Sequence, residues 1–198
     1  MKRSTTIATL LLAAAFATLQ FSHEGAAQNT PAWTVLFDGT NLNAWNTIGN
    51  ANWKLGEGAV EASSGNGFLV SKESYSDFEI KVEFWVDEEA NSGIFIRCEN
   101  PTQIDANNAY EVNIYDKRPD QTYRTGSIVE VAKPSSTINT GGKWNTFQIT
   151  ARGGQLTVTL NNVRTVDVEN KLHARGPVAL QYGGSGLVKF RRVEIRRL

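Results

Sequence analysis

Apolar and polar residues alternate with a period of two along much of this chain, which is the pattern of β-strands with one buried face. No long window beyond residue 27 repeats with the period of a helix. The sequence therefore predicts an all-β fold. The expected strands are residues 78–86, 92–97, 109–115, 144–150, 155–161, 164–168 and 178–181.

Glycine-rich turns separate these segments, and short strands joined by such turns are typical of a sandwich or barrel. The last strand carries an irregularity. Its apolar residues stand at even positions up to Phe190 and at odd positions from Val193 onward. One extra residue would restore the buried face, so the sequence predicts a β-bulge near Arg191 and Arg192.

The first residues follow a different pattern. Lys2 and Arg3 give a basic start, an apolar segment follows at 7–19, and small residues end at Ala27. This order is that of a secretory signal peptide, so we expect residues 1–27 to be removed and the mature protein to be secreted or periplasmic. The apolar segment is shorter than the roughly 20 residues of a membrane helix, so no membrane attachment is expected after cleavage. A retained N-terminal anchor is the alternative.

Residues 28–198 are expected to form one domain with its own core. The chain carries 20 Lys and Arg against 20 Asp and Glu, so it lacks the basic surplus that binds nucleic acid. Cys98 is the only cysteine, which excludes an intrachain disulfide. His173 is the only histidine beyond the leader, which excludes a histidine-rich metal site. No cofactor is required by the sequence, and a calcium site of oxygen ligands stays open.

Candidate chemistry comes from the polar faces of three expected strands. Trp85 stands on the polar face of its strand, where an indole fits the apolar C–H face of a sugar ring; cover by a loop is the alternative. Alternation sends Arg97, Glu111, Asn113 and Tyr115 away from the core as well. We expect these side chains to share one open surface that could bind a carbohydrate. A solvated Arg97–Glu111 ion pair of little energetic weight is the alternative.

Asp116 lies five positions after Glu111 and should lean to the opposite side of the strand, so a glycosidase pair of carboxylates there is not favoured. Asp38 is expected to form a turn. The remaining residues of interest are expected to be structural: a core position for Trp45, Trp53 and Trp144, and a surface position for His173.

Several short motifs occur in a fixed order. They include Phe37-Asp38-Gly39, Asn91-Ser92-Gly93-Ile94, Tyr110-Glu111-Val112 and Trp144-Asn145. Together with Gly176-Pro177-Val178-Ala179-Leu180-Gln181, they make residues 33–198 resemble the 3-keto-disaccharide hydrolase family. The resemblance implies a concanavalin A-like jelly roll of two antiparallel sheets, in agreement with the strand pattern.

The substrates that this resemblance implies are glycosides oxidised to a ketone at carbon 3 of the sugar. Such a ketone acidifies the hydrogen on carbon 2, so the glycosidic oxygen can leave by elimination and water can then add. The reaction needs a base, a stabiliser of the enolate and an acid. The resemblance implies that Glu111 is the base or the acid and that Arg97 stabilises the oxyanion. It implies that Asp116 orients Arg97 or binds a hydroxyl or a cation. The implied substrate-binding residues are Trp85, Asn113, Tyr115 and Gln181.

The chain departs from the family pattern after Gln181, where many members carry a histidine and this chain has Tyr182 and Gly183. Asn113 also stands where glutamine is common. Three functions therefore stay open. An exported hydrolase or lyase for 3-keto-glycosides is expected first, a non-catalytic carbohydrate-binding module of the same fold is the main alternative, and an interaction domain is the third.

Overall fold

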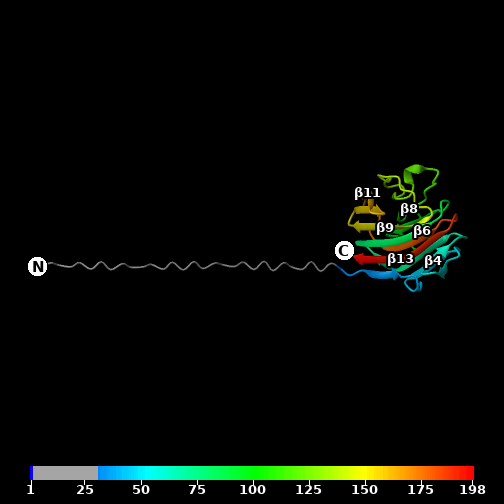
Figure 1. Cartoon of the computed structure of the whole chain (residues 1–198), viewed down its shortest axis with the longest axis horizontal. Coiled ribbons are helices and arrows are strands. Elements are labelled where there is room, and N and C mark those ends of the chain that lie inside the picture. The colour runs from blue at the N-terminus through cyan, green and yellow to red at the C-terminus, as the bar shows by residue number, and fades with distance from the viewer. Residues whose placement is uncertain (2–30) are drawn as a thin grey trace.

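Two antiparallel β-sheets build the protein, as the sequence predicts (Figure 1). The computed structural model describes Met1 and residues 31–198. The predicted leader, apart from Met1, lies outside the described residues. Within those residues, the only helical element is a short 3-10 turn, η1 (Gln121–Tyr123).

The larger sheet has eight strands in the order β11-β10-β9-β6-β13-β4-β3, with β1 paired to β13. The C-terminal strand β13 thus lies between β6 and β4 (Figure 1). The strands are β1 (Thr34–Phe37), β3 (Lys54–Gly56), β4 (Ala59–Ala62), β6 (Phe78–Val86), β9 (Lys143–Arg152), β10 (Gln155–Leu160), β11 (Val163–Glu169) and β13 (Val188–Arg197).

The smaller sheet has five strands in the order β2-β5-β12-β7-β8. Its strands come from distant parts of the chain, so many of the contacts that hold the sandwich together are long-range. They are β2 (Trp45–Gly49), β5 (Gly67–Tyr75), β7 (Ser92–Ile96), β8 (Tyr110–Ile114) and β12 (Gly176–Tyr182).

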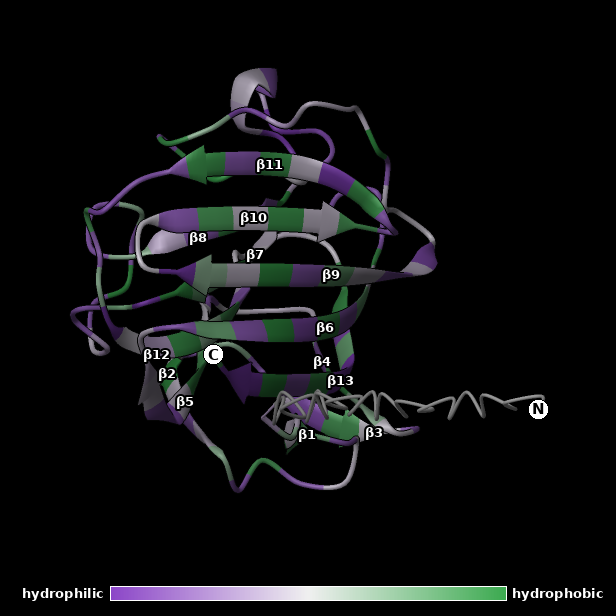
Figure 2. Ribbon diagram, turned by 90° about the vertical axis from the view of Figure 1, so that its left-hand side faces the viewer, coloured by the Kyte–Doolittle hydropathy of each residue, from purple (hydrophilic) through white to green (hydrophobic). Residues whose placement is uncertain are grey.

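The main core lies between the two sheets and follows directly from the alternation. Figure 2 shows apolar and polar bands alternating along β9, β10 and β11. The apolar set of β6, from Phe78 to Val86, is almost completely buried. Phe84 of β6 stacks on Phe147 of β9 with ring centroids 5.1 Å apart. Burial of this apolar surface is the main favourable term in folding.

The predicted bulge in the last strand is confirmed. Phe190 pairs with Phe84 and Arg192 pairs with Glu83, so Arg191 is the extra residue of β13. Both arginines are exposed on the outward face of the eight-stranded sheet, while Phe190 and Val193 stay in the core.

The expected turn at Asp38 is confirmed, since its carboxylate accepts hydrogen bonds from the backbone N–H and the hydroxyl of Thr40. Trp45 is buried as predicted, and Trp53 is half-buried against the core. The core position expected for Trp144 is wrong, because Trp144 is 37% exposed. Phe147 and Ile149 set the buried parity of β9 at odd numbers, which sends Trp144 outward.

The surface position expected for His173 is also wrong, since this residue is only 2% exposed. Its backbone N–H donates to the hydroxyl of Tyr110, and its ring packs edge-on against the Tyr110 ring at 4.8 Å. The loop before β12 therefore folds inward, which the polar sequence around His173 does not indicate. Among the described residues, none lies in a helix long and apolar enough to cross a membrane.

Candidate functional site

A row of polar residues crosses the outward face of the five-stranded sheet. Gly93 of β7 pairs with Asn113 of β8. On the other side of β7, Leu180 pairs with Ile94, and the same register brings Gln181 of β12 opposite Gly93. Because Ile94 and Leu180 point into the main core, the row of Gln181, Gly93 and Asn113 faces the opposite way.

Glu111 lies in the next row of β8, directly opposite Phe95 of β7. Its side chain reaches back diagonally over Gly93. A β-carbon at residue 93 would lie 3.3 Å from both Cγ and Oε1 of Glu111. The glycine therefore leaves the space that the carboxyl group fills between Gln181 and Asn113.

Burial raises the pKa of the Glu111 carboxyl to about 7, and the positive charge of Arg118 acts in the opposite direction. No described residue donates a hydrogen bond to this carboxyl group in the structure. A carboxyl group with a pKa close to 7 is well populated in both its acidic and its basic form at neutral pH. Such a group is suited to general acid–base catalysis.

Several buried polar atoms around Glu111 have no hydrogen-bond partner among the described residues. They are Oδ1 of Asn113, Oε1 of Gln181 and Nε of Arg118. The Asn113 amide N–H is engaged, since it donates to the carbonyl of Tyr123 in η1. An unpaired buried polar atom costs about 1–3 kcal/mol. A water molecule or the hydroxyl of a ligand would complete the hydrogen bonds of these atoms.

Apolar side chains form the neighbouring part of the same sheet face. Phe68 of β5 pairs with Gln181, and its ring packs edge-on against Phe95 at 5.3 Å. Val70 and Ala179 belong to the same small cluster, which is separate from the main core. Phe68 remains half-buried. The face therefore combines an apolar patch with hydrogen-bonding groups, as carbohydrate sites do.

Arg97 does not share this site, so the predicted surface that joins Arg97 to Glu111 is wrong. Arg97 follows the last residue of β7 and has a φ of 55°, which ends the strand alternation. Its side chain is 2% exposed and donates to the Asp77 carboxylate at 3.2 Å. The guanidinium also donates to the carbonyls of Ser76, Gly153 and His173 at 2.8, 2.8 and 3.1 Å.

Trp85 does not share it either. Trp85 faces outward from β6, as predicted, but β6 belongs to the eight-stranded sheet. The outward faces of the two sheets look to opposite sides of the sandwich, so Trp85 and Glu111 lie on opposite sides. Strand alternation gives the face of a residue within its sheet, but the sheet itself depends on long-range pairing. Tyr115 is half-buried just beyond the end of β8.

Asp116 lies beyond the end of β8, and its carboxylate is fully engaged. It accepts hydrogen bonds from the hydroxyl of Thr125 at 2.6 Å, from the N–H and hydroxyl of Thr140 at 2.6 and 3.1 Å, and from the N–H of Gly141 at 3.2 Å. The side chain is 13% exposed. Asp116 therefore ties together distant parts of the long connection between β8 and β9.

Two members of the site are not predicted from the sequence. Gly93 belongs to the Asn91-Ser92-Gly93-Ile94 motif, but its role depends on the diagonal reach of Glu111. Arg118 lies in the loop after β8, where the polar sequence gives no sign that its side chain acts on Glu111. No group of three or more His, Cys, Asp or Glu side chains within residues 31–198 is arranged to hold a metal ion.

The fold is a jelly-roll β-sandwich, and its five-stranded sheet carries a half-buried carboxyl group near polar atoms that have no hydrogen-bond partner within residues 31–198. Residues 32–196 match the family model of the 3-keto-alpha-glucoside-1,2-lyase-like domain. The chain belongs to this family, which confirms the resemblance seen in the sequence and gives the protein a carbohydrate-related role. No curated protein matches the chain.

Solved structures share the fold at low sequence identity. A protein named putative glycosyl hydrolase from Parabacteroides distasonis ATCC 8503 is 22% identical, with a TM-score of 0.71 over 84% of this chain and 100% of that one. A second protein of that name and source is 18% identical, with a TM-score of 0.74 over 84% and 94%. The carbohydrate-binding module CBM66 from Bacillus subtilis is 18% identical, with a TM-score of 0.59 over 85% and 97%.

Proposed function

We propose that this protein is an exported enzyme that cleaves the glycosidic bond of 3-keto-glycosides. Membership of the family supports the substrate class. The observation that carries the proposal is the half-buried carboxyl group of Glu111, which lies over Gly93 and has a pKa raised to about 7 by burial. Export rests on the predicted leader at residues 1–27.

In the proposed reaction, the Glu111 carboxylate removes the proton from carbon 2 of the 3-keto sugar. The C–H electron pair is first held as the enolate of the carbon 3 ketone, and it then forms the double bond between carbons 1 and 2 as the bond from carbon 1 to the glycosidic oxygen breaks. The departing alkoxide takes up the proton that Glu111 now holds, which restores the carboxylate, and the sugar leaves as an unsaturated ketone. Water then adds across the double bond, so that the net result is hydrolysis.

Arg118 is the residue that we assign to the developing enolate charge, in place of Arg97. Its buried Nε has no partner among the described residues, and its charge acts on Glu111. A cation or hydrogen-bond donor at a developing oxyanion typically contributes a factor of about 10²–10³ to the rate. Asn113 and Gln181 would bind sugar hydroxyls through their unpaired oxygens, with Phe68 against the C–H face of the ring.

The test is turnover of 4-nitrophenyl 3-keto-α-glucoside by the mature protein, with the unoxidised glucoside as the control. We expect nitrophenol release from the oxidised substrate alone. In D₂O, the product sugar should carry deuterium at carbon 2, because the proton removed there is replaced by a deuteron from the solvent when water adds. The proposed reaction is contradicted if neither the α-linked nor the β-linked 3-keto-glucoside is cleaved. It is also contradicted if nitrophenol is released and the product sugar carries no deuterium at carbon 2.

One observation favours the second candidate, a non-catalytic carbohydrate-binding module. Tyr182 and Gly183 stand where many family members carry a histidine. Glycine has no side chain, and Tyr182 is turned into the core, where its hydroxyl donates to the carbonyl of Gly186 at 3.1 Å. It therefore does not replace a histidine at the site. Binding of the 3-keto-glucoside without turnover would support this alternative.

A further inference from the structure

The outward face of the eight-stranded sheet carries its own arrangement of aromatic and charged residues. Trp85 of β6 pairs directly with Trp144 of β9, and Lys189 of β13 pairs with Trp85 on the other side. The Lys189 ammonium lies 6.0 Å from the centroid of the Trp85 ring. Two indoles on adjacent strands thus form the floor of this face.

The β-bulge places Arg191 on the same floor. As the extra residue of β13, Arg191 points outward and forms an ion pair with Glu83. Its guanidinium lies over the Trp144 ring, 4.2 Å from the centroid. A bulge that re-aims a side chain is common next to functional sites. The stacked guanidinium adds hydrogen-bond donors to the aromatic floor.

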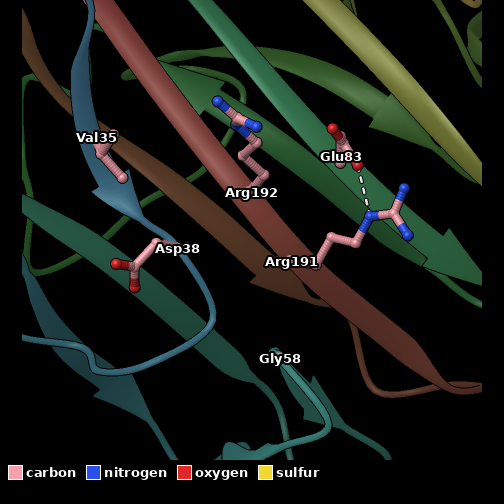
Figure 3. A pocket seen from close by; sticks show the side chains of 6 residues that line it. All are labelled: Val35, Asp38, Gly58, Glu83, Arg191 and Arg192. Carbon is pink, nitrogen blue, oxygen red and sulfur yellow. Dashed lines mark hydrogen bonds and ion pairs between the residues drawn. The ribbon is translucent and has the colours of Figure 1, made fainter.

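Arg191 stands where two clefts meet. One cleft of about 580 Å³ is lined by Val35, Asp38, Gly58, Glu83, Arg191 and Arg192 (Figure 3). The other, of about 320 Å³, has Trp85, Trp144 and Lys189 in its lining, along with Arg191 and the β3–β4 hairpin. Each has the size of a small-molecule site. Because they share Arg191, they offer room for a ligand longer than one sugar ring.

The Phe37-Asp38-Gly39 motif fixes the position of the β3–β4 hairpin, which lines both clefts. Gly58 ends the turn between β3 and β4, and it lines the larger cleft. Gly39 has a φ of 91°, and a β-carbon there would collide with the Gly58 backbone. Only glycine permits this approach. The motif thus fixes the hairpin beside the tryptophan floor, far from Glu111 on the other sheet.

The charges of the clefts indicate the kind of ligand. Acidic and basic residues balance along the two linings: Asp38, Glu57 and Glu83 against Lys189, Arg191 and Arg192. A balanced set lacks the positive surplus that an anionic polymer requires. Charged groups of both signs beside indole rings fit a neutral glycan, whose hydroxyls donate and accept while its C–H faces stack on aromatic rings.

We propose that the Trp85–Trp144 face is a second, non-catalytic binding surface for a neutral oligosaccharide chain, separate from the Glu111 site. Such a surface would hold an extended glycan on one side of the sandwich, whatever the chemistry on the other. The proposal does not depend on turnover at Glu111.

The test is isothermal titration of the full mature protein with maltohexaose, cellohexaose and laminarihexaose, and with polygalacturonate as an anionic probe. At least one neutral hexasaccharide should bind. Trp144→Ala and Trp85→Ala should each weaken this binding by about tenfold or more, the scale of losing an aromatic anchor. Trp33→Ala is the matched control, because Trp33 stacks with Lys81 and Arg196 at 4.6 and 4.7 Å but lines neither cleft.

Glu111→Gln separates this proposal from the proposed function, since it should abolish turnover and leave hexasaccharide binding unchanged. As a control, circular dichroism and thermal melting of each variant should match those of the wild type, which checks that the variants are folded. The proposal is overturned if no neutral hexasaccharide binds, if binding survives both tryptophan substitutions, if Trp33→Ala weakens it equally, or if polygalacturonate binds more tightly.

Discussion

The carboxyl group of Glu111 lies over Gly93 on the adjacent strand, close enough that a β-carbon at residue 93 would be 3.3 Å from Oε1. The two residues are not paired with each other, since Glu111 pairs with Phe95 and Gly93 with Asn113. The diagonal reach brings the carboxyl group from beside a phenylalanine to the middle of a polar row. Its position therefore depends on the absence of a side chain at residue 93.

Gly93→Ala should displace this carboxyl group by a few tenths of an ångström and reduce turnover more than stability. The φ of Gly93 is not positive, so alanine fits the backbone. Misplacement of a catalytic group is costly, and we expect kcat to fall by about tenfold or more. Gly56→Ala is the control, because a β-carbon there would meet no atom within 4 Å. Equal kcat in the two variants would contradict the assigned position.

Glu111→Gln should change how stability depends on pH. Below about pH 4.5, the carboxyl group is protonated in both the folded and the unfolded state. Between 4.5 and about 7 the unfolded chain ionises while the folded protein keeps its proton, so the free energy of unfolding falls as pH rises. The loss ends above pH 7 and amounts to at most roughly 3 kcal/mol.

Urea denaturation at pH 4 and pH 8 measures this effect. The glutamine variant should gain stability relative to the wild type at pH 8 and match it at pH 4. Glu130→Gln serves as the control, since Glu130 is exposed. A stability difference that is the same at both pH values would mean that burial does not raise the pKa of Glu111.

The strands from β6 onward, their buried faces and the bulge at Arg191 could be predicted because they depend on local alternation, whereas β1 to β5 lie outside the expected ranges. The grouping of Glu111, Asn113 and Gln181 on one face is also consistent with it. The sequence does not show which sheet each strand joins. For this reason alternation alone predicts Trp85 beside Glu111, although Trp85 lies on the opposite side of the sandwich. Arg97 was misplaced because one residue with positive φ ended the alternation.

Arg97→Lys should therefore act on stability. Lysine keeps the charge but lacks the planar group that reaches the Ser76, Gly153 and His173 carbonyls together. Leaving such buried acceptors unpaired should lower the free energy of unfolding by about 2 kcal/mol or more. Thermal melting measures the loss, while kcat of the folded fraction should stay the same. A loss of about 100-fold in kcat without a change in melting temperature would return Arg97 to the active site.

Asp116→Asn should have a similar structural effect. The asparagine amide would place donors opposite the N–H groups of Thr140 and Gly141 or the hydroxyl of Thr125. We expect a loss of about 1–3 kcal/mol in the free energy of unfolding, from repulsion and unpaired groups. Asp120→Asn is a useful comparison, because Asp120 is an exposed cap of η1. Asp116 has a catalytic role if kcat falls by about 100-fold or more at unchanged stability.

Arg118→Gln tests the electrostatic part of the site. The positive charge of Arg118 lowers the pKa of Glu111 against the larger effect of burial. Removing that charge should raise the pKa further, so the rise of kcat/KM with pH should move to higher pH. If Arg118 also stabilises the enolate, kcat at the high-pH plateau should fall by about 10²–10³.

Arg118→Lys separates these two roles, because lysine keeps the charge but loses the planar donors. Its pH profile should stay close to that of the wild type, with a plateau between those of the wild type and Arg118→Gln. The profile of kcat/KM against pH on the 3-keto-glucoside gives both quantities in one experiment. A glutamine variant with the wild-type midpoint would show that Arg118 does not act on Glu111, whereas a shifted midpoint with an unchanged plateau would limit Arg118 to setting the pKa of the base.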